Sequence, residues 1–416
     1  MKYTENCAQS ILAEERKKYE EYKGLKLSLD MSRGKPNGKQ LDLSKGLFDS
    51  LNSESNLIAS MDYRNYGCLD GIPEAKELFA ELCGVKTTEI MVLGNSSLNI
   101  MYDNLQRSMQ FGLGGNLPFN KQEKLKWICP VPGYDRHFAI TELFGFEMIN
   151  VPIGENGPDM DIIEELVKDE AVKGIWCIPK FSNPQGIVFS DDTVRRFAQL
   201  KPAAKDFRIY WDNAYAVHYI DEDVQMLNLL NVAKEYNNDD IVYMFGSTSK
   251  ITFPGAGVAY VCANEKNLAE MKKYMTLQTI GPNKLNQIAH VRFFGSVEKI
   301  HEHMAKHAKL LKPKFDTVVS ILTEELDNLC SLFVPHGGYF ISCDLPNGTA
   351  KRAVELAKNV GVVMTPAGAT YPYKKDPNDC NVRVAPTFPG IEELTMAMKV
   401  FCCCVKIAWA EKVINA

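Results

Sequence analysis

The chain has 416 residues, which is room for two or three domains at about 150 residues each. Asp and Glu number 52 against 47 Lys and Arg, a formal charge of −5, so the basic excess that binds nucleic-acid backbones is missing. A composition of 45% hydrophobic and 24% charged residues argues against a disordered, collagen-like or coiled-coil protein, and no apolar run approaches the ~18 residues of a membrane span. We therefore expect a globular protein with neither a nucleic-acid nor a membrane partner.

The N-terminus and the cysteines bear on the cellular compartment. The first seven residues, Met-Lys-Tyr-Thr-Glu-Asn-Cys, lack the apolar region of a secretory signal and include an early acidic residue, unlike a transit peptide. The 12 cysteines include no two C-x-x-C motifs at zinc-ligand spacing. We predict a cytoplasmic protein with reduced thiols and no metal site.

The N-terminal quarter of the chain predicts helices, a loop and a turn. Its amphipathic stretches are typical of helices, and its clusters of Gly, Pro, Ser and Asn are typical of loops. Pro73 suits a first helical turn and Gly84 a helix end. In chain order we expect a helix at 5–23, a loop at Ser32–Gly38, a helix between Gly71 and Gly84, an apolar run at Ile90–Leu93, and a helix at Leu98–Met109.

From there, short apolar runs alternate with helical patterns. Helices are expected at Asp191–Leu200 and Asp221–Glu235. Alternating strands and helices imply a largely parallel sheet covered on both faces, with ligands at the carboxyl ends of the strands. The predicted strands are Leu125–Cys129, Glu147–Val151, Gly174–Ile178, Phe207–Trp211, Ile241–Phe245 and Val258–Cys262.

After residue 283 the pattern changes. A long helical stretch precedes strand runs at Gly338–Cys343 and Asn381–Ala385, with helices near Thr349–Asn359 and Ile391–Val413. Two strands with flanking helices indicate a smaller α+β domain. We predict an N-terminal segment over residues 1–50 that packs with the small domain, a large domain over 51–290 and the small domain over 291–416.

Four polar residues are candidates for chemistry, each with a structural alternative. Lys250, which follows the predicted strand Ile241–Phe245, can form a Schiff base with a carbonyl cofactor or be a solvated loop lysine. Asp212 closes another strand, where it can pair with a pyridinium nitrogen or cap a helix. Asn183 lies in Asn-Pro-Gln-Gly, which is also a plain turn sequence. Arg383 lies between two valines, so alternation places it on the opposite face of the strand, where it either belongs to a functional site or faces solvent.

The order and spacing of these residues resemble the fold-type I aminotransferases that depend on pyridoxal phosphate. Asn183 precedes Asp212 by 29 residues, Asp212 precedes Lys250 by 38, and Lys250 precedes Arg383 by 133. In that family Asn-Pro-x-Gly, Asp-x-Ala-Tyr, Ser-x-Ser-Lys and a C-terminal arginine occur in this order. The resemblance covers nearly the whole chain.

Two longer segments narrow the resemblance. Leu29–Pro36 and Ser247–Val258 look like the subgroup of aspartate aminotransferases that is grouped with the MocR-type aminotransferase domain. The resemblance implies an α/β protein of the pyridoxal-phosphate-dependent transferase fold type I. Its large domain would have three layers, α/β/α, with a mainly parallel sheet, and a smaller α+β domain would accompany it.

The resemblance also implies the residues of the cofactor site. Lys250 would form the Schiff base, an internal aldimine, with pyridoxal 5'-phosphate, and would later move the proton between Cα and C4′. Asp212 would hold the pyridinium proton. Tyr215 and Asn183 would hydrogen-bond the ring's phenolic oxygen and lower the imine pKa. Tyr134 would stack on the ring.

His137 lies three residues after Tyr134, on the same face if a helix starts there, and could orient Asp212; a structural histidine is the alternative.

The cofactor phosphate is expected at the turn before the helix Leu98–Met109. Asn95, Ser96 and Ser97 offer backbone N–H groups and hydroxyls there, although an ordinary serine N-cap is the alternative. By resemblance, Ser247 and Ser249 belong to the cofactor site, with Ser247 on the phosphate.

One phosphate ligand of the family is missing. Its arginine in Gly-x-Arg-x-Gly is replaced by Gly255-Ala256-Gly257, and Lys284 is the candidate cation in its place. Tyr66 matches the tyrosine that reaches the phosphate of a neighbouring subunit. The resemblance therefore implies a homodimer with shared active sites.

Substrate recognition is expected from Arg383, which matches the arginine that binds the substrate α-carboxylate, together with Asn183. Gly34 and Arg33 lie in the loop that matches the mobile N-terminal segment. Arg33 binds a second carboxylate or, as an alternative, faces solvent. A second carboxylate site would favour aspartate and glutamate as substrates.

The leading hypothesis is an aminotransferase that converts L-aspartate and 2-oxoglutarate into oxaloacetate and L-glutamate by a ping-pong mechanism. Its alternatives are a transaminase for alanine, an aromatic amino acid or kynurenine, and a pyridoxal-phosphate-dependent lyase. A further alternative is a non-catalytic regulator of the MocR type. The matching motif at Gly34 begins about thirty residues into the chain, so we expect no room for a preceding DNA-binding module.

Overall fold

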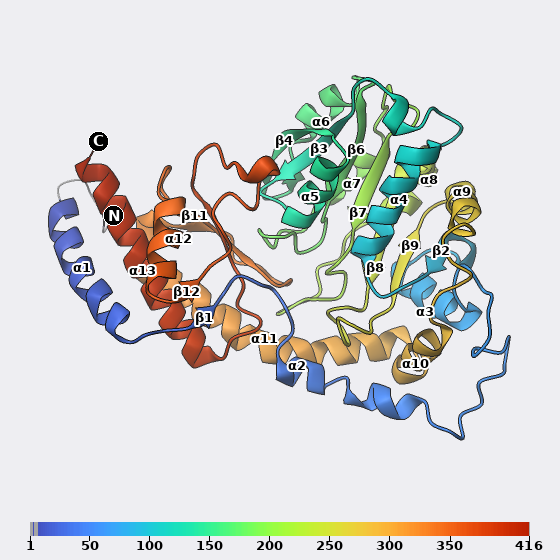
Figure 1. Ribbon diagram of the computed structural model, residues 1–416, viewed down its shortest axis with the longest axis horizontal. Coiled ribbons are helices and arrows are strands. Elements are labelled where there is room, and N and C mark those ends of the chain that lie inside the picture. The colour runs from blue at the N-terminus through green and yellow to red at the C-terminus, as the bar shows by residue number, and fades with distance from the viewer. Residues whose placement is uncertain (1–2, 4–6, 416) are drawn as a thin grey trace.

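A computed structural model describes residue 3 and residues 7–415 (Figure 1). The N-terminal and C-terminal helices lie side by side at one end of the molecule, and the larger sheet with its helices occupies the other end. The helices are α1 (Ala8–Gly24), α2 (Gly38–Asp42), α3 (Pro73–Cys83), α4 (Ser97–Phe111), α5 (Asp135–Leu143), α6 (Met160–Leu166), α7 (Asp191–Ala198), α8 (Leu229–Glu235), α9 (Glu265–Met275), α10 (Lys284–Phe294), α11 (Val297–Leu326), α12 (Ala350–Asn359) and α13 (Ile391–Ile414).

The larger sheet has eight strands in the order β2-β9-β8-β7-β6-β3-β4-β5. The five strands β8, β7, β6, β3 and β4 run parallel, while β9 and β5 pair antiparallel with their neighbours. The prediction of a mainly parallel sheet is therefore confirmed. These strands are β2 (Ile90–Val92), β3 (Lys126–Val131), β4 (Glu147–Gly154), β5 (Gly157–Pro158), β6 (Val172–Cys177), β7 (Arg208–Asp212), β8 (Val242–Ser247) and β9 (Ala259–Cys262).

The central strands β6 and β7 are buried at every residue, as expected for a sheet that helices cover on both faces. Gly174 of β6 allows close packing there, because a Cβ atom at this position would lie 2.4 Å from the ring of Trp127 on β3. Since the carboxyl ends of parallel strands meet at one edge, the residues that follow β3, β6, β7 and β8 gather there.

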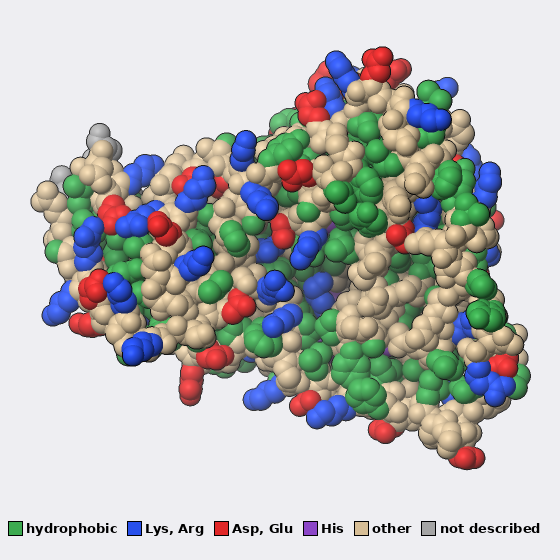
Figure 2. All heavy atoms as spheres, viewed as in Figure 1, with side chains coloured by type: hydrophobic (Ala, Val, Ile, Leu, Met, Phe, Trp, Pro, Cys, Tyr) green, Lys and Arg blue, Asp and Glu red, His purple; other side chains and the backbone are tan. Residues whose placement is uncertain are grey.

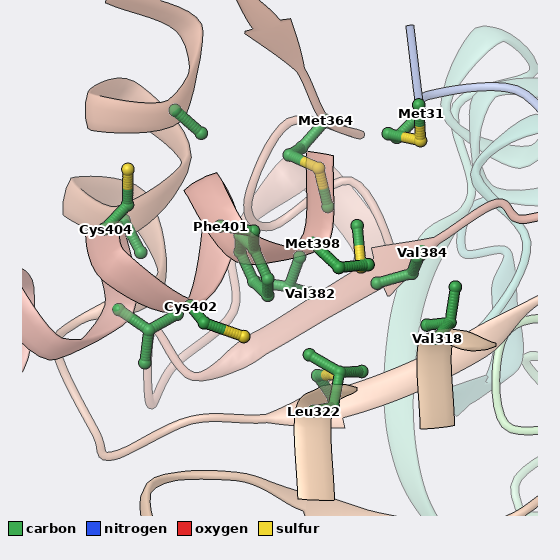
Figure 3. Close-up of a cluster of buried hydrophobic side chains, with 14 of the residues drawn as sticks. Met31, Val318, Leu322, Met364, Val382, Val384, Met398, Phe401, Cys402 and Cys404 are labelled. Atoms are coloured by element: carbon green, nitrogen blue, oxygen red, sulfur yellow. The ribbon is translucent and has the colours of Figure 1, made fainter. Parts of the chain in front are cut away.

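The smaller part of the fold contains a three-stranded antiparallel sheet of β10 (Ser331–Leu332), β11 (Ile341–Asp344) and β13 (Asn381–Val384), and a parallel pair of β1 (Leu29–Asp30) and β12 (Val362–Val363). Figure 3 shows Phe401 and Met398 of α13 against Val382 of β13 in its apolar core. A smaller α+β part beside the main sheet is therefore confirmed. The division of the chain at residues 50 and 290 stays a prediction.

Two predicted elements differ from the structure. The helix expected at Asp221–Glu235 begins only at Leu229, because Asp221 and Asp223 form ion pairs of 2.7 Å with lysines elsewhere in the fold and Asn228 caps the helix. The strand expected from Gly338 begins at Ile341. Residues 5 and 6 of the first predicted helix lie outside the described residues.

The cysteines and helices bear on two of the general expectations. The eleven cysteines from Cys68 to Cys404 are free thiols. None of the helices in the described part of the chain is long and apolar enough to cross a lipid bilayer.

Two buried histidines of α11, His303 and His307, lie next to the short helix α2. His307 Nδ1 accepts a hydrogen bond from Gln40 Nε2 at 3.3 Å, and His307 Nε2 lies 3.2 Å from His303 Nε2. Burial, reinforced by His303, lowers the pKa of His307 from the usual 6.5 to about 3. His307 is therefore neutral in the native protein at physiological pH.

This lowered pKa predicts acid destabilisation. Below about pH 6.5 the unfolded chain binds a proton at His307 that the native protein does not bind, so the free energy of unfolding falls as the pH decreases. When the pH falls from 6.5 to 4.5, we expect the free energy of unfolding of His307→Leu to decrease by roughly 2 kcal/mol less than that of the wild type. Urea denaturation at the two pH values measures this difference. The control Leu311→Ala removes buried apolar contacts on the same helix but no titratable group, so it should lower the stability at every pH and leave the slope unchanged. Equal slopes for all three proteins would contradict a neutral native His307.

Candidate active site

Four of the sequence-predicted residues lie just where parallel strands of the larger sheet end. Asp212 ends β7, and Lys250 lies three residues after the end of β8. Asn183 follows β6, and Tyr134 follows β3. The sheet therefore brings together side chains from four separate stretches of sequence.

Lys250 lies beside a buried tyrosine. Its Nζ atom is 4.9 Å from the centre of the Tyr215 ring. Desolvation lowers the pKa of Lys250, and the negative charge of Asp212 partly opposes this shift. Burial raises the pKa of Tyr215 well above its usual value, so its hydroxyl keeps its proton. The lysine amine is thus easier to deprotonate than a surface lysine.

Asp212 is buried, and only one of its two carboxylate oxygens has a hydrogen-bond partner. His137 Nε2 lies 3.1 Å from its Oδ2 atom, while Oδ1 has no hydrogen-bond partner. Tyr134 is the N-cap of α5, so His137 falls in the first turn of this helix, where its ring stacks on Trp176 at 4.5 Å. The structure places His137 against Asp212 and leaves one carboxylate oxygen free for a further donor.

Arg383 is buried, so the solvent-facing alternative is wrong. Its Nη1 atom donates to Asn183 Oδ1 at 3.2 Å and to Asp135 Oδ1 at 2.9 Å. Its guanidinium carbon lies 4.7 Å from the centre of the Phe340 ring, and its Nε atom is 3.5 Å from Thr365 Oγ1. All four residues of β13 are buried, so both faces of this strand are covered and the arginine is buried although it alternates with valines.

The N-terminal loop reaches the same place. Gly34 packs so closely on Phe340 that a Cβ atom would lie 2.4 Å from the ring, and Thr365 donates to the Ser32 carbonyl at 3.0 Å. Arg33 is exposed, and among the described residues its side chain makes no hydrogen bond or ion pair. The structure thus brings Gly34 to the Arg383 site and leaves Arg33 at the surface.

The turn before α4 has the form of an anion site. Ser96 is the N-cap residue, but its hydroxyl makes no capping hydrogen bond, and Ser97 is buried at the first helical position. Ser249 Oγ donates to the Asn95 carbonyl at 2.8 Å, and Ser247 Oγ donates to Ser249 Oγ at 3.1 Å. The turns after β2 and β8 are therefore linked. The serine N-cap alternative therefore holds for the position of Ser96 but not for its hydroxyl.

Lys284 and Tyr66 lie together beside this region. Lys284 Nζ donates to the Gly67 carbonyl at 3.0 Å. Tyr66 is 82% exposed, and both residues line a surface hollow of about 590 Å³ with Arg64. No hydrogen bond joins Lys284 to the turn at residues 94–97 within the described chain. Asn286 Nδ2 donates hydrogen bonds to the carbonyl oxygens of Ala256 and Gly257, in the segment where the family has its arginine.

Sequence reasoning missed several residues of the site. Asp135 and Phe340 hold Arg383, and Tyr339 donates to the Lys250 carbonyl at 3.3 Å while accepting from Gln40 at 3.1 Å. For Asp135 the available signal was its position directly after Tyr134. The others carry no local pattern, because their partners lie far away in the sequence.

Positive charge gathers around the site. Figure 2 shows Lys and Arg side chains clustered around a hollow in the middle of this face, between the two parts of the fold. The chain as a whole is acidic, with a formal charge of −5. A local basic surround favours the approach of anionic ligands.

Comparisons with known proteins agree with this geometry. A family model described as "Aspartate amino-transferase" matches residues 3–416. An aspartate aminotransferase from Corynebacterium glutamicum is 45% identical over 406 residues, which are 96% of this chain and 94% of the relative. The crystal structure of an aspartate transaminase from the same species has a TM-score of 0.96 at 44% identity and covers 99% of this chain and 98% of that one.

A more distant structure shares the fold. The α-aminoadipate aminotransferase from Thermus thermophilus, solved in complex with N-(5'-phosphopyridoxyl)-L-leucine, has a TM-score of 0.76 at 20% identity and covers 92% of this chain and 93% of that one. The predicted α/β fold class is confirmed by the two structural matches.

Proposed function

The chain belongs to the aspartate aminotransferase family, and on this premise we propose that it transfers the amino group of L-aspartate to 2-oxoglutarate. The products would be oxaloacetate and L-glutamate, formed in two half-reactions of the ping-pong type. The observation that carries the proposal is the arrangement of Lys250, the half-satisfied Asp212 and the buried Arg383 around one edge of the sheet.

The residues fit pyridoxal phosphate on three counts. The free, buried Oδ1 atom of Asp212 suits a protonated pyridine nitrogen. The lowered pKa of Lys250 suits an amine that must react with an aldehyde. The uncommitted Ser96 hydroxyl and the first N–H groups of α4 suit a phosphate. We propose that the cofactor is held by Lys250, Asp212, Tyr215, Tyr134, His137, Asn183, Asn95, Ser96, Ser97, Ser247 and Ser249.

When bound, pyridoxal phosphate supplies an aldehyde that bonds to amines and a ring that withdraws electrons from the amino acid's Cα atom. Lys250 Nζ would take the proton from the amino acid's Cα atom and deliver a proton to the C4′ atom of the cofactor. Asp212 would keep a proton on the ring nitrogen, and His137, which contacts its Oδ2 atom, would orient the carboxylate. Tyr215, which keeps its own proton, would donate a hydrogen bond to the ring oxygen.

Arg383 provides the carboxylate-binding part of the proposal. A buried guanidinium is suited to the α-carboxylate that amino acids and 2-oxo acids share. Because Gly34 has no side chain, the Phe340 ring has room beneath the Arg383 guanidinium. We propose Arg33 as the second carboxylate ligand; since it is exposed here, the N-terminal loop must bring it inward for this role.

We also propose a homodimer. Tyr66 projects from the surface beside Lys284 and Arg64, at a position suited to reach the phosphate of a neighbouring subunit. A neighbouring subunit would also supply positive charge to a phosphate turn that lacks the family's arginine. The free thiols support a reducing, cytoplasmic location.

The visible spectrum of the purified protein tests the function. We expect an absorbance band from the lysine-bound cofactor, and addition of L-aspartate alone should remove this band and release oxaloacetate. Subsequent addition of 2-oxoglutarate should restore the band and yield L-glutamate.

Two other outcomes would change the assignment. A band that L-aspartate leaves unchanged would contradict the substrate but not the cofactor, and alanine, aromatic amino acids and kynurenine would then be tested. A protein that neither shows the band nor acquires it with added pyridoxal phosphate would contradict the cofactor assignment.

A further inference from the structure

Asp135 makes a contact that the proposed function does not use. Its Oδ1 atom accepts a hydrogen bond from Arg383 Nη1 at 2.9 Å, which makes an ion pair between a 36% exposed carboxylate and a 7% exposed guanidinium. The two residues are 248 positions apart in the sequence. The Asp135 carboxylate therefore occupies the Arg383 guanidinium, to which we propose that the substrate carboxylate binds.

The occupied atom is the one that faces the site. Arg383 Nη1 also donates to Asn183 Oδ1, so both of its hydrogens are in use. Asn183 lines a small cavity together with Tyr134 and His137, the residues beside Asp212. Nη1 therefore points toward the cofactor side, where a substrate carboxylate would arrive.

Of the two acceptors on Nη1, only Asp135 is free to leave. Asn183 is 4% exposed and enclosed by the turn after β6, whereas the Asp135 side chain reaches solvent. Asp135 is also the first residue of α5, and a carboxylate that turns outward there stays close to the positive end of the helix. An arriving carboxylate can thus displace Asp135 at small cost.

Resting on the proposed function, we propose that Asp135 is a built-in competitor of the substrate for Arg383. It neutralises the buried guanidinium while no substrate is bound, which removes the cost of an uncompensated buried charge. It then yields Nη1 to the α-carboxylate and takes it back on release. Asp135 is therefore an affinity-setting residue, which lowers the affinity for amino acids and 2-oxo acids alike and favours product release between the two half-reactions.

The test measures carboxylate binding to the holoenzyme by calorimetry, with propionate and succinate as probes that carry no amino group. Asp135→Asn keeps an acceptor for Arg383 but removes the charge, so we expect both probes to bind about fivefold tighter, the size of a partly exposed ion pair. KM for L-aspartate should fall by a similar factor, with kcat changed by less than about twofold. Asp135→Glu should restore the weaker binding.

Matched variants separate this proposal from the proposed function. Asp161→Asn removes a carboxylate that pairs with Arg196 on α7, away from the site, and should bind both probes like the wild type. If Asp135→Asn binds the probes equally or more weakly while Arg383→Gln loses them, the competitor role is wrong and the carboxylate site stands. A gain for succinate alone would also overturn the proposal, because Asp135 would then act on the second carboxylate. If Arg383→Gln binds both probes like the wild type, the carboxylate site and the competitor role both fall.

Discussion

Lys250→Ala is expected to reduce transamination by at least roughly 10⁴-fold, the upper range for removing a group that transfers a proton in the transition state. The variant would lose the amine that we propose binds the cofactor covalently and the base that we propose moves the Cα proton. The half-buried lysine beside Tyr215 has no substitute, because the other buried lysine nearby, Lys180, pairs with Asp223 at 2.7 Å. The absorbance band of the lysine-bound cofactor should disappear with the activity.

Reduction with borohydride followed by peptide mapping gives a readout that does not depend on turnover. In the wild type, the cofactor should become attached permanently to the peptide that contains Lys250. Lys180→Met is the matched control, and it should keep both the label and the band. A label on another lysine, or a band that persists in Lys250→Ala, would contradict the assignment of Lys250.

The ends of the central strands were predictable because their signals are local. Apolar runs mark β7 and β8, and a polar residue that ends such a run falls at the carboxyl edge of a parallel sheet. Asp212 and Lys250 could therefore be placed at the same edge from the sequence. The likeness to a known family then gave these positions chemical roles that strand periodicity alone does not give.

The surroundings of Arg383 were not predictable in this way. A period of two shows that Arg383 points away from its neighbouring valines, but it does not show whether another part of the chain covers that face. In the structure, Phe340 and the loop at Gly34 cover it, and Asp135 comes from the other part of the fold. Burial of this arginine depends on tertiary contacts that no local pattern encodes.

The same limit explains the shortened helix α8 and the Gln40 network. Asp221 and Asp223 suit a first helical turn by type, yet distant lysines hold both in a loop. Gln40 is polar, and nothing in its local sequence indicates burial, but it is fully buried between His307 and Tyr339. Its burial is stable because its amide group has partners there.

Asp212→Asn is expected to lower kcat/KM for L-aspartate by roughly 10³-fold, about 4 kcal/mol of transition-state stabilisation. Asparagine has the same size, and its carbonyl oxygen can still accept a hydrogen bond from His137. It has no charge with which to keep a proton on the ring nitrogen, so the ring withdraws electrons less well. The loss should appear in the rate of the half-reaction with L-aspartate, measured by rapid mixing.

Two variants show whether the charge of Asp212 is responsible. Asp206→Asn changes a buried carboxylate that pairs with Lys173 at the opposite end of the sheet, and its half-reaction rate should be that of the wild type. His137→Phe removes only the partner of Oδ2, so a smaller loss of about tenfold is expected, the size of one hydrogen bond to a charged group. If Asp212→Asn lost no more than His137→Phe, the free Oδ1 atom would have no part in holding the ring proton. The carboxylate would then act only through its hydrogen bond to the histidine.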